Sequence, residues 1–165
     1  MDICYRSIES PTGRLLLSAD DRGLRTLAFG EGRTPPAAES SWRRGGAPLD
    51  EPVRQIRAFF AGELQRFDLS LQPQGTEFQR RVWRALLEIP YGQTISYGEL
   101  ARRLGNPAAS RAVGLANGSN PIAIIIPCHR VIGSNGKLTG YGGGLENKRW
   151  LLDFERQQAR LAFGS

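Results

Sequence analysis

Residues 124–132 place a thiol, an imidazole and a guanidinium between two apolar runs, in the sequence IIIPCHRVI. Both runs are rich in β-branched residues, which favours buried strands. Pro127 cannot donate a hydrogen bond to a neighbouring strand, so the strand must bend or end there. The chain must therefore hold Cys128 at a kink inside a rigid apolar frame.

His129 is the only histidine in the chain, so any imidazole chemistry must take place beside Cys128. The two cysteines lie 124 positions apart, which is no disulfide framework and fits a reducing cytosol. Cys4 is expected to be an ordinary half-buried strand residue. Two Cys and one His cannot supply the usual four ligands of a structural zinc ion. We expect a cytoplasmic protein with no metal and no organic cofactor.

A length of 165 residues allows one or two small domains with a substantial core. No apolar run is long enough to span a bilayer. The first residues lack the basic and apolar regions of a signal peptide. We therefore expect no signal peptide and no membrane partner.

The positive charge is confined to one half of the chain. Residues 1–74 hold 10 Arg and 10 acidic residues, whereas residues 75–165 hold 10 Arg, 2 Lys and 6 acidic residues. The whole excess of +6 therefore lies in the half that carries Cys128. Such an excess indicates a polyanionic partner, nucleic acid first, although a solvated surface in an Arg-rich proteome would look the same.

The first 74 residues predict a small sheet with one helix packed on it. Short strands are expected at 3–9, 14–19 and 24–29, because turn-forming residues separate these apolar runs. Residues 30–48 indicate a loop. Asp50 is expected to cap a helix that ends near Gly62. We find no motif for a site in this part.

Residues 75–165 predict helices at 76–89, 96–104, 107–117 and 146–156, with a hairpin turn at 133–137. Asn106 is expected to cap the third of these segments. Three helices followed by a two-stranded wing outline a winged helix-turn-helix, whose second helix enters a DNA groove. The expected fold is therefore α+β, with a sheet-and-helix domain at 1–74 and a winged helix-turn-helix-like domain at 75–165.

The expected helix at 107–117 is unusual for such a motif. Its side chains are mostly small, and Arg111 is its one long cation. Small side chains would let the helix enter a narrow minor groove, where Arg111 could be pushed into the base stack. Equally, the small residues could pack on neighbouring helices and leave Arg111 solvated. The residues alone favour neither interpretation over the other.

The motifs in residues 76–155 resemble those of the O6-alkylguanine-DNA alkyltransferases. The resemblance is carried, in order and at matching spacings, by ISY at 95–97, GNP at 105–107, RAVG at 111–114, NP at 120–121, PCHRV at 127–131 and YxGG at 141–144. Residues 1–74 match that family's variable N-terminal domain, which is ribonuclease-H-like, in size and placement only. The resemblance implies direct DNA repair.

In the implied reaction, an alkyl group moves from guanine O6, and from thymine O4, in double-stranded DNA to Cys128. A thiolate is a strong nucleophile for an sp³ carbon. The resemblance implies that His129 deprotonates Cys128 through a water and that Glu155 orients the imidazole, as in a catalytic triad. Spacing alone would favour a solvated carboxylate at Glu155.

The resemblance also implies how the base is held. Tyr97 would donate to guanine N3, and the backbone N–H of Gly142 would lie near O6, where many family members carry Ser. The carbonyls of Cys128 and Val131 would accept from the exocyclic amine. Asn120 would brace the turn before the nucleophile, and a wall around Tyr141 would move to admit the base.

Guanine O6 is hidden in duplex DNA, so the nucleotide must be flipped out. The resemblance places the helix at 107–117 in the minor groove, with Arg111 filling the space that the base leaves and Tyr97 turning the backbone. The DNA-contacting residues implied on this helix are Ser110, Arg111, Ala112 and Gly114.

An S-alkyl thioether is stable and no second cysteine lies nearby, so we expect one turnover per molecule. A monomer in solution is expected, with clustering on DNA left open. The main alternative is a winged-helix protein that senses alkylation without turnover. A non-catalytic alkylguanine-binding relative would lack the cysteine that Cys128 supplies. A cysteine hydrolase using Cys128 and His129 would have to admit water and turn over.

Overall fold

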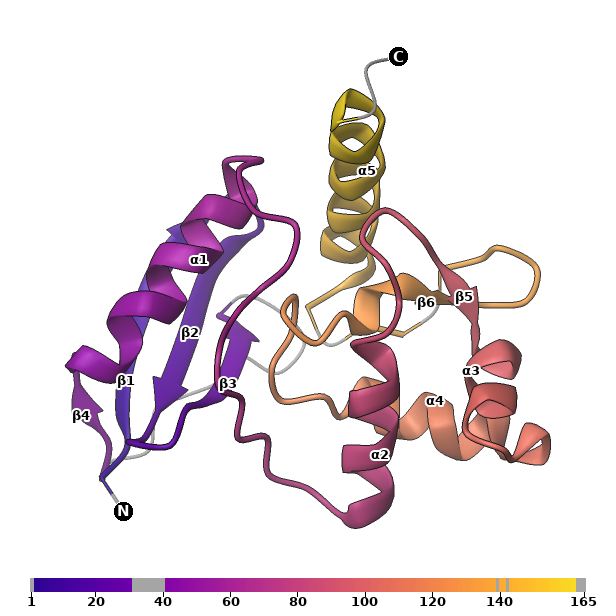
Figure 1. Cartoon of the computed structure of the whole chain (residues 1–165), viewed down its shortest axis with the longest axis horizontal. Coiled ribbons are helices and arrows are strands. Elements are labelled where there is room, and N and C mark those ends of the chain that lie inside the picture. The colour runs from indigo at the N-terminus through magenta and orange to yellow at the C-terminus, as the bar shows by residue number, and fades with distance from the viewer. Residues whose placement is uncertain (1, 31–40, 139, 142, 163–165) are drawn as a thin grey trace. The chain divides into compact units, whose positions relative to one another are not determined.

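The computed structural model describes residues 2–30, 41–138, 140–141 and 143–162, which form two compact units (Figure 1). The first unit contains the chain up to Gln74 together with Pro121–Ala123. The second contains Gly75–Asn120 and the chain from Ile124 onward. The chain therefore leaves the second unit for three residues and returns to it just before Cys128.

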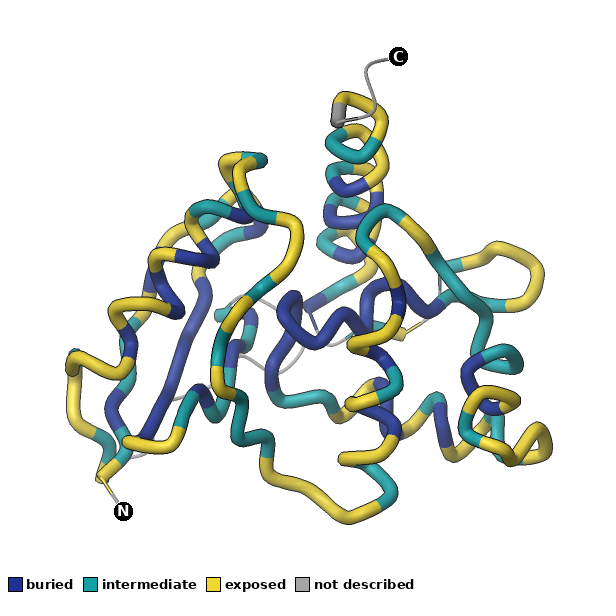
Figure 2. Tube along the Cα trace, viewed as in Figure 1, coloured by how far each residue is buried: buried dark blue, intermediate teal, exposed yellow. Residues whose placement is uncertain are grey.

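A four-stranded sheet forms the first unit, in the order β3-β2-β1-β4. Strands β1 (Cys4–Ser10), β2 (Gly13–Ala19) and β3 (Leu24–Phe29) are antiparallel neighbours, which confirms the three predicted strands. Strand β4 (Arg43–Arg44) pairs in parallel with β1, within the stretch predicted as a loop. Most of β2 is buried (Figure 2), because it is an inner strand of the sheet.

Helix α1 (Asp50–Phe60) lies across one face of this sheet (Figure 1) and follows a short 3-10 turn, η1 (Ala47–Leu49). Its buried Val53, Ile56 and Phe59 recur at helical spacing, as predicted. Asp50 is the first helical residue rather than the predicted cap. Its carboxylate instead accepts a hydrogen bond from Arg6 Nη2 over 2.9 Å.

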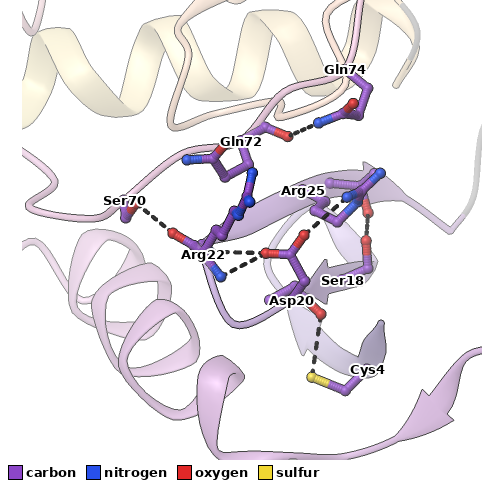
Figure 3. Close-up of polar contacts among 11 residues, drawn as sticks. Cys4, Ser18, Asp20, Arg22, Arg25, Ser70, Gln72 and Gln74 are labelled. Carbon is purple, nitrogen blue, oxygen red and sulfur yellow. Dashed lines mark hydrogen bonds and ion pairs between the residues drawn. The ribbon is translucent and has the colours of Figure 1, made fainter. Parts of the chain in front are cut away.

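A buried carboxylate closes the turn between β2 and β3 (Figure 3). Asp20 Oδ1 accepts from the backbone N–H groups of Arg22 (2.8 Å) and Gly23 (3.2 Å), and Oδ2 accepts from Arg25 Nη1 (2.9 Å). Burial raises the pKa of Asp20, but Arg25 and the two N–H groups outweigh it and the pKa is lowered. Gly23 is required here, because a Cβ at its φ of 155° would collide with the Ser70 carbonyl.

Residues 121–123 join the first unit through the backbone of β3. The Leu27 N–H donates to Pro121 O over 3.0 Å, and the Ala123 N–H donates to Leu27 O over 2.9 Å. Ile122, between these two residues, is fully buried. The segment that precedes the Cys128 turn is therefore anchored at both ends by hydrogen bonds.

The second unit contains α2 (Glu77–Leu86), α3 (Tyr97–Arg103), α4 (Ser110–Gly118) and α5 (Leu145–Ala162), and the 3-10 turns η2 (Pro107–Ala109) and η3 (Cys128–Arg130). Strands β5 (Ile95–Ser96) and β6 (Val131–Ile132) pair in parallel. Helix α4 begins three residues later than predicted, after η2. Asn106 precedes η2 but makes no side-chain cap.

The helix starts of α2 and α3 follow local chemistry. Thr76 and Gln79 form a reciprocal capping box, with bonds of 3.1 Å and 2.9 Å. The Ser96 hydroxyl accepts from the Glu99 N–H over 3.0 Å. Trp83 on α2 is buried, and its Nε1–H donates to Ala116 O over 2.9 Å, so the indole ties α2 to α4.

In the described part of the chain, no helix combines the length and the apolar character needed to cross a membrane.

Replacement of Asp20 tests the buried turn. Asp20→Ala leaves two N–H groups without an acceptor and Arg25 without its partner, so we expect a loss of about 2–3 kcal/mol in the free energy of unfolding. Urea denaturation at pH 7 measures this loss. Asp21→Ala, at the exposed neighbouring position, is the matched control and should change stability little. Equal effects of the two changes would contradict the assignment.

Candidate active site

The three isoleucines before Pro127 are buried as predicted, but they do not form a strand. Residues 123–125 form a turn, and Ile124 has a φ of 71°. A β-branched residue rarely adopts this left-handed conformation, so it is held there by its surroundings. After Pro127, the Cys128 N–H turns back to Ile126 O over 2.8 Å. Apolar character alone could not distinguish a buried strand from this buried turn.

Cys128 is the first residue of η3, and only 5% of its surface is exposed to solvent. Asn120 Nδ2 donates to Ile126 O over 2.8 Å, which bridges the turn that leads to the thiol. The Arg130 N–H donates to Pro127 O over 3.0 Å. These bonds place Cys128 and His129 on a tight, buried turn.

A single carboxylate organises the residues that follow the thiol. Glu155 on α5 is fully buried, and Oε2 lies 2.8 Å from His129 Nε2. Arg130 donates from Nε to Oε1 and from Nη2 to Oε2, both over 2.8 Å. Arg130 Nη1 also donates to Ile89 O over 2.7 Å, so the guanidinium is held at both ends. Arg130 was not among the predicted site residues.

Burial by itself raises the pKa of Glu155, but His129 and Arg130 outweigh burial and lower it from 4.5 to about 2. Glu155 is therefore ionised at neutral pH and can only accept hydrogen bonds. In its neutral form, the His129 ring must then carry its proton on Nε2, the nitrogen that faces Glu155. His129 Nδ1 is buried, has no partner in the described part of the chain, and carries the lone pair that can take up a proton.

The surroundings of the Cys128 thiol shift its pKa in opposite directions. Burial is the largest effect and raises the pKa of Cys128, whereas a hydrogen bond with Asn120, the charge of Lys148 and a hydrogen bond with Tyr141 lower it. Burial prevails, so the thiol keeps its proton at neutral pH in this structure. Any reaction of Cys128 as a thiolate therefore requires the loss of that proton.

Lys148 was not among the predicted site residues. Lys148 on α5 is fully buried, and its Nζ donates to Val131 O over 2.7 Å. Burial lowers the pKa of Lys148 and the charge of Cys128 raises it, with burial the larger effect. Lys148 lies seven residues before Glu155, two helical turns away on the same face. That seven-residue spacing from Glu155 could have identified Lys148 from the sequence.

The remaining predicted residues lie on α3 and α4. Tyr97 begins α3 and is half-buried, and Gly114 on α4 faces its ring. Arg111 and Ala112 are exposed on α4, and Ser110 is half-buried. Gly142 lies outside the described residues.

Helix α4 also exposes an apolar side chain that sequence analysis did not single out. Leu115 is 73% exposed and lies one turn after Arg111. Apart from Arg111, the other exposed residues of α4 are small, namely Ala112 and Gly118. Helical spacing from Arg111 would have identified Leu115.

The charge of the second unit lies mostly on its surface. Arg130 and Lys148 are buried among its twelve cations, and Glu155 among its six acidic residues. Ten cations and five acidic residues therefore remain outside the core, with a net charge of +5. Cys4, the other free thiol, is buried in the first unit, and its Sγ–H donates to Ala19 O over 3.5 Å.

Glu155 links this site to stability at low pH. Because its pKa in the folded protein lies below the usual 4.5, Glu155 stabilises the fold above pH 4.5, and this contribution is lost as pH falls to 2. The lost contribution is about 3 kcal/mol. Glu155→Gln should be less stable than wild type at pH 7 and should lose less stability between pH 5 and pH 3 in urea titrations.

Glu51→Gln is the control for the acid titration. The pKa of Glu51 is also lowered to about 2, by hydrogen bonds from Arg54 and Gln55, but its side chain is 52% exposed and solvent screens the interaction. We expect the Glu51 variant to follow the wild-type titration. If Glu155→Gln also follows it, the assigned role of Glu155 is wrong.

Two family models together match most of the chain. Residues 3–73 match the ribonuclease-like domain of 6-O-methylguanine DNA methyltransferase, and residues 77–157 match its DNA binding domain. The two matches meet near Gln74, where the first unit ends.

Relatives match over nearly the full length. The methylated-DNA–protein-cysteine methyltransferase of Methanosarcina acetivorans is 56% identical over 92% of this chain and 97% of its own. The Mycobacterium tuberculosis protein of that name is 54% identical over 95% of this chain and 94% of its own. The M. tuberculosis O6-methylguanine methyltransferase structure has a TM-score of 0.88 at 52% identity, and the structure of its complex with DNA a TM-score of 0.87 at 52%, each covering 94% of both chains. The chain belongs to the methylated-DNA–protein-cysteine methyltransferase family.

Proposed function

We propose that this chain repairs DNA directly, by moving the alkyl group of O6-alkylguanine, and of O4-alkylthymine, in double-stranded DNA to Cys128. The observation that carries the assignment is the buried thiol on the same turn as His129, whose Nε2 meets Glu155 over 2.8 Å. Family membership supports the reaction class.

The proton leaves the thiol before or during attack. His129 Nδ1 carries the free lone pair of the ring, so it receives the Cys128 proton, through a water as the family resemblance implies. The imidazolium that forms is stabilised by the Glu155 carboxylate, as in a triad. Arg130 is a positioning residue, because it holds Glu155 in the orientation that His129 requires.

The substitution then takes place at the alkyl carbon. The Cys128 thiolate forms the new S–C bond as the C–O6 bond breaks, and the bonding electrons leave with the guanine. As the family resemblance implies, Tyr97 would donate at N3 and the backbone N–H of Gly142 would lie near O6, and both would stabilise the charge that develops on the base. The product is a thioether on Cys128 and an unmodified guanine, and nothing in the reaction restores the thiol.

The exposed face of α4 is suited to a minor groove. Ser110, Ala112 and Gly114 are small, and Arg111 extends from the helix toward solvent. Minor-groove proteins often insert apolar wedges between base steps, and Leu115 could act as one beside Arg111. The net surface charge of +5 supplies attraction to phosphates independent of sequence.

Base flipping follows from the burial of the thiol, because a base in the stack cannot reach Cys128. Asn120 and Val131 would border the pocket that receives the base, with Tyr141 as a movable wall. We place this activity in the cytoplasm, where free thiols such as Cys4 and Cys128 persist.

Mass spectrometry tests the acceptor. After incubation with excess duplex DNA carrying O6-methylguanine, the wild-type chain should gain one methyl group, on the peptide that contains Cys128. Cys128→Ala should gain none, and Cys4→Ala should behave as wild type. Release of more than one methyl group from DNA per chain would exclude a single-use acceptor.

Arg111 should matter only when the base must leave a duplex. Arg111→Ala is expected to slow methyl transfer from duplex DNA at least tenfold, which corresponds to about 1.4 kcal/mol, and to leave the reaction with free O6-benzylguanine unchanged. Arg156→Ala removes the same charge from the exposed surface of α5. If both variants slow transfer from duplex DNA equally, Arg111 contributes charge alone.

A further inference from the structure

The turn that follows α2 holds the guanidinium of Arg130 in two ways. Ile89 O accepts from Arg130 Nη1 over 2.7 Å. The ring of Tyr91, two residues later, lies over the guanidinium, with 5.6 Å between Arg130 Cζ and the ring centroid. Since Glu155 accepts from Nε and Nη2, hydrogen bonds occupy the edges of the guanidinium and an aromatic ring covers one of its faces.

The turn that carries Tyr91 rests on α5 (Figure 1). Gly92 adopts a φ of 80°, and a Cβ at this position would lie 2.9 Å from Ala159 Cβ and 3.5 Å from Glu155 O. Glycine is therefore required for the turn to approach the helix this closely. The helix that carries the Glu155 carboxylate thus also fixes the position of the turn.

Tyr91 brings an apolar ring and no charge to the ion pair. Its hydroxyl oxygen is buried. Burial and the charge of Glu155 raise the pKa of Tyr91 to about 12, against the opposite effect of Arg130, so the phenol is neutral at pH 7. A guanidinium is weakly hydrated and stacks well on an aromatic face.

Water is the competitor of this ion pair. The Arg130 side chain is only 8% exposed and that of Glu155 is fully buried. Charged hydrogen bonds are stronger where water is excluded. Removal of the Tyr91 ring would open one face of the guanidinium to water, which would then compete for both the cation and the carboxylate.

We propose that Tyr91 is a positioning residue for alkyl transfer to Cys128. Its ring shields the Arg130 guanidinium from water and so keeps the Glu155 carboxylate in place. Glu155 in turn holds the proton of His129 on Nε2, which leaves Nδ1 as the atom that receives the thiol proton. The inference rests on the proposed function, since its kinetic consequence requires that reaction.

The first measurement follows the imidazole proton in the resting protein. His129 is the only histidine in the chain, so its ring signals in NMR spectra of isotope-labelled protein are unambiguous. In the wild-type chain, the buried Nε2–H that faces Glu155 should exchange slowly with water. In Tyr91→Leu, water admitted beside the ion pair should make this exchange about tenfold faster.

The second measurement is single-turnover methyl transfer from duplex DNA that carries O6-methylguanine. In Tyr91→Leu the rate constant at saturating DNA should fall about tenfold, while the affinity for DNA stays unchanged. Tyr91→Phe keeps the ring and should stay within about twofold of wild type in both measurements. Tyr91→Met, with a flexible apolar side chain that fills gaps, repeats the test should the leucine variant not fold.

Tyr5→Leu is the matched control. Tyr5 is also a half-buried tyrosine, but it lies on β1 in the first unit and its ring contacts Trp42, with 6.4 Å between the ring centroids. The same substitution at this position should leave the exchange of the His129 proton and the rate constant unchanged.

The outcomes separate the inference from the function on which it rests. If either quantity is unchanged in both the leucine and the methionine variants of Tyr91, the inference is overturned while methyl transfer stands. An equal loss in Tyr91→Phe or in Tyr5→Leu also overturns it, because the effect would then come from the hydroxyl or from general loss of stability. Absence of methyl transfer by the wild-type chain overturns the proposed function, and the inference with it.

Discussion

The site depends on one buried negative charge. The Glu155 carboxylate receives two hydrogen bonds from Arg130 and lies 2.8 Å from His129 Nε2. Burying the charges of Glu155 and Arg130 away from water is costly, and close, well-oriented hydrogen bonds between them are needed to offset that cost. Arg130 Nη1 also donates to Ile89 O over 2.7 Å. The hydrogen bonds of Arg130 therefore both orient Glu155 toward the imidazole and connect α5, η3 and the segment after α2. Packing and chemistry therefore share one interaction.

The thiol illustrates the converse arrangement, in which a group is kept uncharged until it is used. Burial holds the proton on Cys128, while Asn120, Lys148 and Tyr141 favour its loss. In the resting site a neutral thiol is a poor nucleophile and resists oxidation. Under the proposed single-use reaction, a Cys128 thiol that reacted with small electrophiles would inactivate the molecule before repair. In the proposed reaction, burial restricts attack by Cys128 to an alkyl group on a base that reaches the η3 turn.

Sequence patterns predicted the features that depend on local spacing. The helix start predicted at Thr76 and the order of helices follow from residues a few positions apart, whereas the capping box of Thr76 with Gln79 was found only in the structure. The run of isoleucines was misassigned, because buried strands and buried turns are equally apolar and the φ of Ile124 leaves no trace in composition. Lys148 was missed for another reason. A polar residue on a helix is usually exposed, and only tertiary packing showed that Lys148 faces the Cys128 turn.

The short excursion of residues 121–123 into the first unit affects how the chain can be divided. The boundary after Gln74 suggests two modules that could be produced separately. A fragment that starts at residue 75 would carry Ile122, buried in the full chain, with its apolar surface uncovered. The other fragment would lack the backbone partners of Leu27. Residues 121–123 therefore make the first unit depend on a segment from the second half of the sequence, just before Cys128. A truncation or gene fusion at the boundary after Gln74 would remove these hydrogen bonds.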